Sequence, residues 1–377
     1  MWRERASTSA LQSAGEAGDT TAKSENGSPV DQKARPDPDA PHKPKSLKQI
    51  TVRSWRYLVP RTFREFLRDE CPDLAAGLTY YGVLAALPAL IALISALGLI
   101  GQRPAAVAVI LDVATRVVPA SGLAMIQPVL ERLTESSGAT LALVLGVGVA
   151  LWFVANYVAA FGRAMNRIYG ISEGRPVWKL QPLMLLVTVL LGLLCFLAVL
   201  LLVISGPLAR ALGNVLGVGS TTVLLWNICK WPLLAGIVVV VVALLYYITP
   251  NVRQPRFRWL SPGALVAIVT WFCGSALFGL YVASFSGYDA VYGSLAGVIV
   301  FLVWLWVSNT ALLLGAELDA EIERARELQA GIGAEREVQL PPRDTRASTK
   351  QHAQLEKDHA EGRRIRQQSG TSDEPES

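Results

Sequence analysis

PLMLLVTVLLGLLCFLAVLLLVI, residues Pro182–Ile204, is the stretch that decides the fold. It contains no Asp, Glu, Lys or Arg. A helix that crosses about 30 Å of hydrocarbon needs roughly 20 apolar residues. A helix in a soluble core also keeps a polar stripe, whereas this stretch is apolar all round. It therefore predicts a transmembrane helix.

Six uncharged runs of this kind occur, in a chain of 377 residues that is 52% hydrophobic and only 17% charged. They are Leu74–Gln102, Ser136–Gly162, Leu180–Ala209, Trp231–Val252, Trp259–Tyr288 and Ala290–Ala316. We therefore predict an all-α integral membrane protein with six transmembrane helices. The expected spans are about 75–100, 139–161, 181–205, 231–249, 262–284 and 293–316.

Polar segments flank the predicted six-span domain, residues 74–330. Residues 1–50 and 331–377 are rich in polar and charged side chains, so both are predicted to be disordered tails. No apolar run follows the first residues, which predicts no cleavable signal peptide. Residues 51–73 form a basic juxtamembrane segment.

The distribution of Lys and Arg predicts the orientation. Eight of them lie between Lys43 and Arg68, and the second and fourth loops are also basic. The first loop is sparsely charged for its length, the third holds Arg210, and the fifth has none. Cytoplasmic loops carry the positive excess, so both termini are expected in the cytoplasm of a bacterium, with anionic lipid beside the basic segments. Because anchoring at the cytoplasmic face explains these basic segments, no nucleic-acid partner is predicted.

The first external loop contains two amphipathic segments. Pro104–Val118 is too short and too interrupted by charge to span, and Ser121–Leu133 carries apolar residues at helical spacing. We expect two amphipathic helices at the outer interface, serving as packing cover or as a gate.

Few residues in the predicted spans have side chains that could bind a metal, hold a cofactor or transfer a proton. The three histidines lie in the tails and the four cysteines are far apart, which predicts no metal and no cofactor. The polar span residues are all uncharged, which disfavours a buried proton or ion relay. They are Tyr80, Tyr81, Asn156, Tyr246, Tyr247, Ser275, Tyr281, Ser308 and Asn309.

Proline and glycine mark places where the helices bend or approach closely. Pro88 lies within the first span and predicts a kink, which serves either packing or a hinge. Ser261 and Pro262 are typical of a helix start. Gly293 and Gly297 share one helical face and favour close packing. Trp304 lies near the middle of its run, away from the interfaces where tryptophan usually lies.

The stretch LLLGAELDAE, Leu312–Glu321, ends the last span. Glu317 directly follows the apolar run, where an unpaired carboxylate is costly. We expect it to pair with Arg163 or Arg167, which leave the second span at the same level. The helix is expected to continue through ELDAEIERAREL into the cytoplasm, with Glu321 and Glu323 on a solvated face.

Several stretches resemble the YihY/BrkB family of six-span bacterial inner-membrane proteins. They are LAAGLTYYGVLAALPALIAL (74–93), FGRAMNRIYGI (161–171), YYITPN (246–251) and the region from Ser261 to Glu321, within a resemblance that covers about Phe63 to Arg326. The resemblance implies motif positions at Tyr80, Pro88, Asn166, Tyr169, Pro250, Gly263, Tyr281, Tyr292, Gly293, Gly315 and Glu317. Some members carry the label ribonuclease BN or virulence factor.

Three functions are compatible with these observations. Polar but uncharged spans and a kinked helix favour translocation of an envelope lipid or another amphiphile. A membrane scaffold or envelope-integrity factor without transport is the first alternative. A ribonuclease is disfavoured, because metal-dependent cleavage needs clustered carboxylates or histidines. The oligomeric state is not predicted.

Overall fold

The computed structural model describes residues 29–100, 139–203, 220–255, 261–284 and 296–370. The described residues form helices joined by loops, with one isolated backbone bridge between Val252 and Pro342. The two amphipathic helices predicted in the first external loop lie outside this part of the chain.

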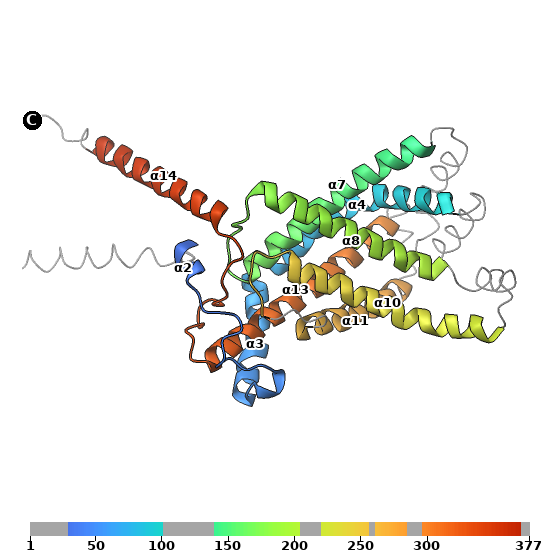
Figure 1. Ribbon diagram of the computed structural model, residues 1–377, viewed down its shortest axis with the longest axis horizontal. Helices are drawn as coiled ribbons and strands as arrows, with labels where there is room; N and C mark the ends of the chain where they lie inside the picture. Colours follow the sequence, from blue (N-terminus) through green and yellow to red (C-terminus); the bar gives the residue numbers. More distant parts are fainter. Residues whose placement is uncertain (1–28, 101–138, 204–219, 256–260, 285–295, 371–377) are drawn as a thin grey trace, which may run out of the picture.

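Six long helices extend from the end where α3 (Val52–Arg68) lies and diverge toward the opposite side of the molecule (Figure 1). They are α4 (Cys71–Ile100), α7 (Ala139–Ile168), α8 (Val177–Val203), α10 (Ser220–Ile248), α11 (Pro262–Ser284) and α13 (Ala296–Gln329). Five of them, α7, α8, α10, α11 and α13, are long and apolar enough to cross a membrane. The sixth, α4, is 30 residues long. The prediction of an all-α, multi-pass membrane protein is confirmed.

The helix ends follow backbone chemistry as well as hydrophobicity. α11 begins at Pro262, as predicted, since the Ser261 hydroxyl accepts a hydrogen bond from the Ala264 N–H at 3.0 Å. α13 continues past residue 316, the end of the predicted span, to Gln329, as expected for the stretch ELDAEIERAREL. An uncharged run marks the hydrocarbon, whereas helical hydrogen bonds extend into water when the sequence allows it.

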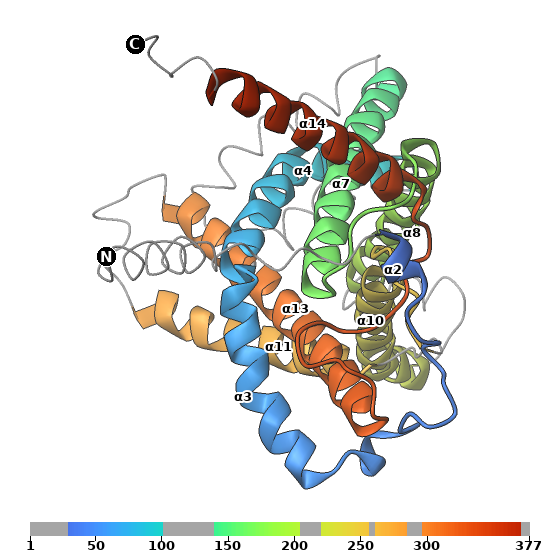
Figure 2. The same ribbon diagram turned by 90° about the vertical axis from the view of Figure 1, so that its left-hand side faces the viewer.

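Short elements gather at one end of the bundle, which we call the charged end. They comprise α2 (Pro29–Lys33), η1 (Leu47–Gln49), α3 (Val52–Arg68), the last turns of α13 (317–329) and segment 331–345. α3 runs across the long helices and packs against α13 (Figures 1 and 2). The last helix, α14 (Arg346–Gly370), projects from this same end.

Parts of both predicted disordered tails are folded, so the predicted limits 1–50 and 331–377 are wrong for these parts. Ile50 packs with Leu58, Ile322 and Ala325, while Val338 and Leu340 join the main core. Composition predicted disorder because these segments contain few apolar residues. Those few are the ones that become buried against α13 and its neighbours.

The bundle has an apolar core between its helices and further apolar side chains on its outer faces, as expected for a membrane protein. Leu78, Phe161, Tyr246 and Leu313 lie in one core between α4, α7, α10 and α13. Large apolar side chains on the outward faces of α8 and α11, such as Phe272, remain exposed. Lipid tails cover such a surface without penalty.

Candidate functional site

A buried ionic layer surrounds the last turns of α13. Glu321 accepts from the Arg324 Nε at 2.8 Å, and the Arg61 Nε of α3 lies 3.3 Å from its other oxygen. Glu321 is 1% exposed. Both arginines are also largely buried, so this cluster joins α3 to α13 away from water.

Lys43 forms the second half of this layer. Its Nζ lies 3.1 Å from Glu323 and 3.2 Å from Glu327, and all three side chains are buried. Glu323 also pairs with Arg326, whose Nε donates to the Pro44 carbonyl at 2.7 Å. The segment before α3 is therefore held to α13 by charge.

The prediction that Glu321 and Glu323 lie on a solvated face is wrong. Helical geometry correctly places them on the continuing helix, but α3 and the segment around Lys43 cover that helix. Charges with such burial need partners, and each of these two glutamates has two cationic partners. The acidic run is part of the folded body.

The predicted partners of Glu317 are also wrong. The Arg167 Nη2 donates to Glu70 at 2.7 Å, and Arg163 is exposed; within the described residues neither pairs with Glu317. Glu317 is 1% exposed, and its Oε2 has no hydrogen-bond partner among the described residues. Its strongest charged neighbours are acidic, led by Asp69 and Glu321.

We therefore expect Glu317→Gln to leave the melting temperature in detergent unchanged or raised. The substitution removes a charge that faces other carboxylates and leaves no arginine unpaired. Glu321→Gln is the matched control, because it weakens two buried ion pairs and should cost about 1–3 kcal/mol. A lower melting temperature for Glu317→Gln than for Glu321→Gln would contradict this assignment.

Asn166 and Asn251 tie the loops of the charged end together. The Asn166 Oδ1 accepts from the Asn251 N–H at 2.7 Å, and its Nδ2 donates to Glu173 at 3.0 Å. Asn251 in turn donates to the carbonyls of Ser172 and Asp344. Pro250, a predicted position, is buried beside it. The two asparagines fix the α7–α8 loop, the α10 end and segment 331–345 in one arrangement.

Two arginines complete this loop cluster. Arg175 binds both oxygens of Glu173, and Arg343 donates to the Val252 carbonyl at 2.8 Å. Burial lowers the pKa of Arg343. The hydrogen bond from the Arg346 N–H, together with Lys179, lowers the pKa of Asp344 below its usual value, against the opposing effect of burial. These groups act as structural ties between chain segments far apart in sequence.

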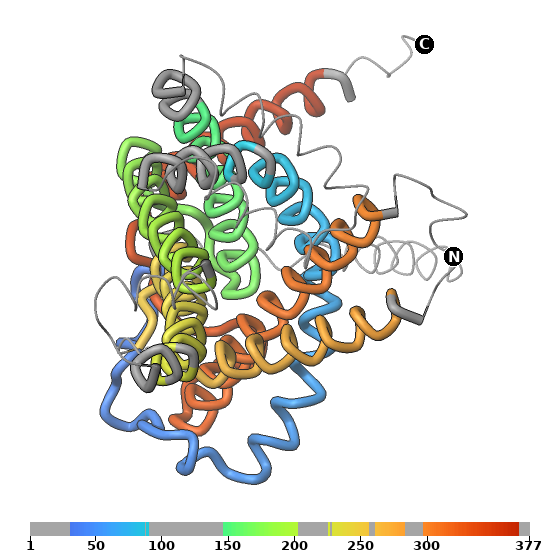
Figure 3. The backbone as a smooth tube through the Cα atoms, turned by 90° about the vertical axis from the view of Figure 1, so that its right-hand side faces the viewer, coloured from blue at the N-terminus to red at the C-terminus, as the bar shows by residue number. Residues whose placement is uncertain are grey.

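α11 and α13 cross at a pair of glycines. A Cβ on Gly263 would lie 2.0 Å from the Gly315 carbonyl oxygen, and a Cβ on Gly315 would lie 2.3 Å from the Gly263 oxygen. The Gly263 N–H donates to Asp319 at 2.7 Å, and the Ser261 hydroxyl donates to the same carboxylate. Figure 3 shows the two helices converging from their far ends toward this contact. The geometry explains why the motif positions 263 and 315 are glycine.

Polar side chains inside the bundle satisfy one another. The Tyr157 hydroxyl donates to Asn309 at 2.7 Å, and Asn309 donates to Thr79 at 3.1 Å, which joins α7, α13 and α4. The tryptophans have similar roles: the Trp304 Nε1 donates to Ser275 at 3.2 Å, between α13 and α11. Trp304 therefore lies in mid-span because it hydrogen-bonds a neighbouring helix.

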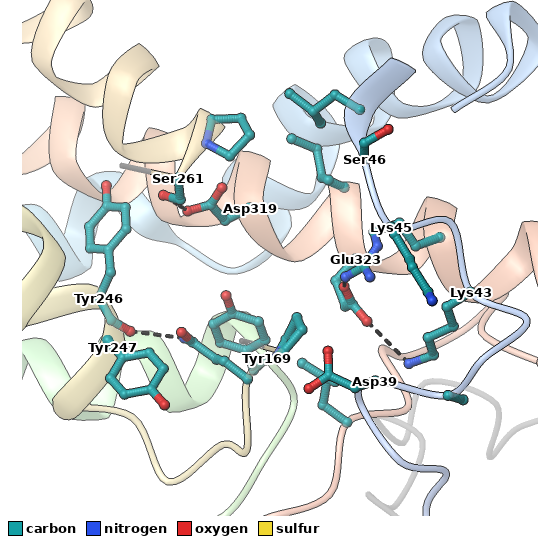
Figure 4. A pocket seen from close by; sticks show the side chains of 18 of the residues that line it. Asp39, Lys43, Lys45, Ser46, Tyr169, Tyr246, Tyr247, Ser261, Asp319 and Glu323 are labelled. Atoms are coloured by element: carbon teal, nitrogen blue, oxygen red, sulfur yellow. Dashed lines mark hydrogen bonds and ion pairs between the residues drawn. The ribbon is translucent and has the colours of Figure 1, made fainter. Parts of the chain in front are cut away.

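A cavity of about 520 Å³ opens at the charged end. Figure 4 shows Asp319 and Ser261 on one wall, Tyr246 beside Ser261, Tyr169 below them, and Lys43 facing Glu323 on the opposite side. The cavity lies between the ends of α10, α11 and α13 and the segment around Lys43. It combines both signs of charge with aromatic rings.

The other predicted positions are scattered. Tyr80 and Tyr281 are exposed on α4 and α11, and the Asn156 amide donates to the Trp152 carbonyl of its own helix. Helix α4 continues through Pro88, and Gly297 lies in the first turn of α13. Tyr292 and Gly293 lie outside the described residues. The positions that converge at the charged end are Asn166, Tyr169, Pro250, Gly263, Gly315 and Glu317.

The role of Lys43 in the ionic layer was not predicted, and neither were the contacts of Asp319 and Asn251. Lys43 lies in a segment that reads as a disordered tail. Asp319 could have been found from its position one helical turn after Gly315, on the face that meets α11. Within the described ranges, no group of three or more His, Cys, Asp or Glu side chains could hold a metal ion.

Comparisons with known proteins agree with the motifs. The ribonuclease-like protein YfkH of Bacillus subtilis (strain 168) is 27% identical over 267 residues, which cover 71% of this chain and 95% of that relative. UPF0761 membrane proteins of Alkalilimnicola ehrlichii and Azotobacter vinelandii are 31% and 30% identical. These alignments cover 71% and 72% of this chain, but 59% and 64% of those relatives.

No solved structure matches the chain. A family model described as virulence factor BrkB matches residues 62–339. That range includes the six long helices, with the acids in the last turns of α13, and most of segment 331–345; Lys43 and Arg61 of the ionic layer precede it. The chain therefore belongs to the virulence factor BrkB family.

Proposed function

We propose that the protein moves an envelope lipid or a similar amphiphile across the bacterial cytoplasmic membrane, with the charged end and both termini in the cytoplasm. The cavity at the charged end carries this proposal. An amphiphile needs a polar pocket for its headgroup beside an apolar path for its tails. The cavity lies where apolar helices α10 and α11 meet the charged segments.

The lining of the cavity suits a polar headgroup. Its volume of about 520 Å³ is within the range of small-molecule sites, roughly 300–1,000 Å³. Lys43 and Arg326 supply positive charge, and Asp319 and Glu323 supply negative charge. A zwitterionic or hydrogen-bonding headgroup fits such a mixed lining better than a single ion does. The outer faces of α10 and α11 offer large apolar side chains to the tails.

The test is a lipid-translocation assay with purified protein in proteoliposomes. Ser46→Trp places a large side chain at the rim of the cavity, and we expect it to slow translocation about tenfold, an effect of about 1.4 kcal/mol on the barrier. Leu355→Trp, on the exposed α14, is the matched control and should keep the wild-type rate. Translocation no faster with protein than in empty liposomes would overturn the proposal.

A membrane scaffold without transport is the alternative function. The ion pairs of Lys43 determine which N-terminal deletion can test it. Removing all residues before Ser46 would also remove Lys43, which anchors α13. Deleting residues 1–28 avoids this loss. A scaffold that recruits partners through its N-terminal tail loses its phenotype in this variant, whereas a transporter keeps its activity.

We propose that the chain is not an enzyme, although one relative is named as ribonuclease-like. The acids of α13 after Glu317 are bound by lysine, arginine, serine or backbone groups, which leaves few oxygens for a catalytic metal. RNA cleavage by rigorously purified protein that disappears in Glu317→Gln would contradict this part of the proposal.

A further inference from the structure

Helix α3 has one apolar face that no part of the described chain covers. Val52, Val59, Phe63 and Leu67 are spaced by seven, four and four residues, so they lie on one side of the helix. Phe63 is 58% and Leu67 is 67% exposed. The opposite side of α3, which includes Leu58, is buried against α13.

Arginines border this apolar face. Helix α3 contains five arginines and a single acid, Glu65. Arg61 and Arg68 pair with that acid. Arg53, Arg56 and Arg64 are exposed, and within the described residues no carboxylate pairs with them. At 100° per residue, all three lie on or next to the apolar face.

The position of α3 indicates what covers this face. Helix α3 is joined through Asp69 and Glu70 to α4, the helix of the first predicted span, and it runs across the direction of α4 (Figures 1 and 2). An in-plane helix at the end of a spanning helix lies at the depth of the lipid headgroups. Apolar side chains there enter the acyl region, and arginines reach the phosphates.

We propose that α3 is an interfacial helix that lies in the cytoplasmic leaflet, with Val59, Phe63 and Leu67 among the acyl chains and Arg53, Arg56 and Arg64 on the phosphates of anionic lipids. The bilayer is the partner that matches both features, because it offers an apolar layer and a negative layer within a few ångströms. This site tethers the charged end, since α3 also carries Arg61 of the ionic layer.

The first test measures lipid binding by the full-length protein. Phosphatidylglycerol is titrated into detergent-solubilised protein, and the rise in melting temperature gives the half-saturating concentration, with phosphatidylcholine as reference. Each arginine contributes about fivefold to anionic-lipid affinity, so Arg53→Gln/Arg56→Gln/Arg64→Gln should weaken binding roughly 100-fold. The matched control removes three exposed charges from α14: Lys350→Gln/Lys357→Gln/Arg363→Gln.

The second test reports the depth of the apolar face. A fluorophore on Phe63→Cys should be quenched by lipids that carry spin labels in their acyl chains, and one on Leu355→Cys of α14 should not. The background keeps the buried Cys71 and replaces the exposed cysteines by serine: Cys195, Cys229 and Cys273.

The outcomes separate lipid from other partners. Equal responses to the two lipids, equal losses in the α3 and α14 triple variants, or an unquenched probe at position 63 would each overturn the proposal. So would binding of an RNA oligonucleotide that depends on the three α3 arginines and leaves the probe unquenched, because the face would then serve a nucleic acid.

Discussion

Replacing Lys43 by methionine is expected to lower the free energy of unfolding by about 3–5 kcal/mol, because it strands buried carboxylates. Lys43 is 2% exposed and is the only cation within 4.0 Å of Glu327 in the described structure. Glu327 keeps one further hydrogen bond, from the Gln339 N–H at 2.7 Å. That neutral donor does not replace a cation in a site closed to water.

The measurement is thermal unfolding in detergent, followed by tryptophan fluorescence. Lys48→Met is the matched control, because Lys48 is exposed in the same segment and its loss should change stability by less than about 1 kcal/mol. The double variant Lys43→Met/Glu327→Gln should recover part of the loss, since it removes both charges. Equal effects of Lys43→Met and Lys48→Met would mean that the buried ionic layer does not form.

The spans could be predicted from sequence because the membrane imposes a simple rule. Hydrocarbon excludes charge over a fixed thickness, so every uncharged run of sufficient length corresponds to a helix. The start of α11 was predicted to the residue, because Ser261 and Pro262 form a local start signal. The continuation of α13 past residue 316 was also predicted, but its burial was not, since α3 and the segment around Lys43 cover it.

The charged end could not be predicted, because its contacts join segments far apart in sequence. Glu317 was assigned a partner by depth alone, and Arg163 and Arg167 do lie at a comparable level. Residues at the same level of the bundle can face different neighbours. Arg167 pairs with Glu70, while Glu317 lies near the acids at the end of α3. Lys43 is separated from Glu323 by 280 residues, and no local pattern marks such a pair.

Gly263 and Gly315 show that a family resemblance can identify important positions without giving their physical role. Gly263 and Gly315 were named because they occupy motif positions, with no physical role. Their spacing in sequence gives no sign that they meet, since each has ordinary apolar neighbours. The structure supplies the reason: each glycine allows the backbone of the other helix to approach.

Gly315→Ala is expected to destabilise the protein by about 1–3 kcal/mol, and by more if the helices cannot separate. Its Cβ would lie 2.3 Å from the Gly263 oxygen and 2.6 Å from the Ala267 Cβ, and these neighbours cannot rotate away. α11 and α13 must move apart, which also strains the Gly263 N–H bond to Asp319 at the cavity wall. Thermal unfolding in detergent measures the loss.

Gly279→Ala on α11 is the matched control for this prediction. Nothing lies within 4 Å of a Cβ at that position, so the change should be neutral or should stabilise the helix by about 0.5–1 kcal/mol. Gly263→Ala should resemble Gly315→Ala, and the double variant should lose less than the sum, because one separation of the helices relieves both contacts. If Gly315→Ala is as stable as Gly279→Ala, or if the double variant is strictly additive, the two helices do not cross at these glycines.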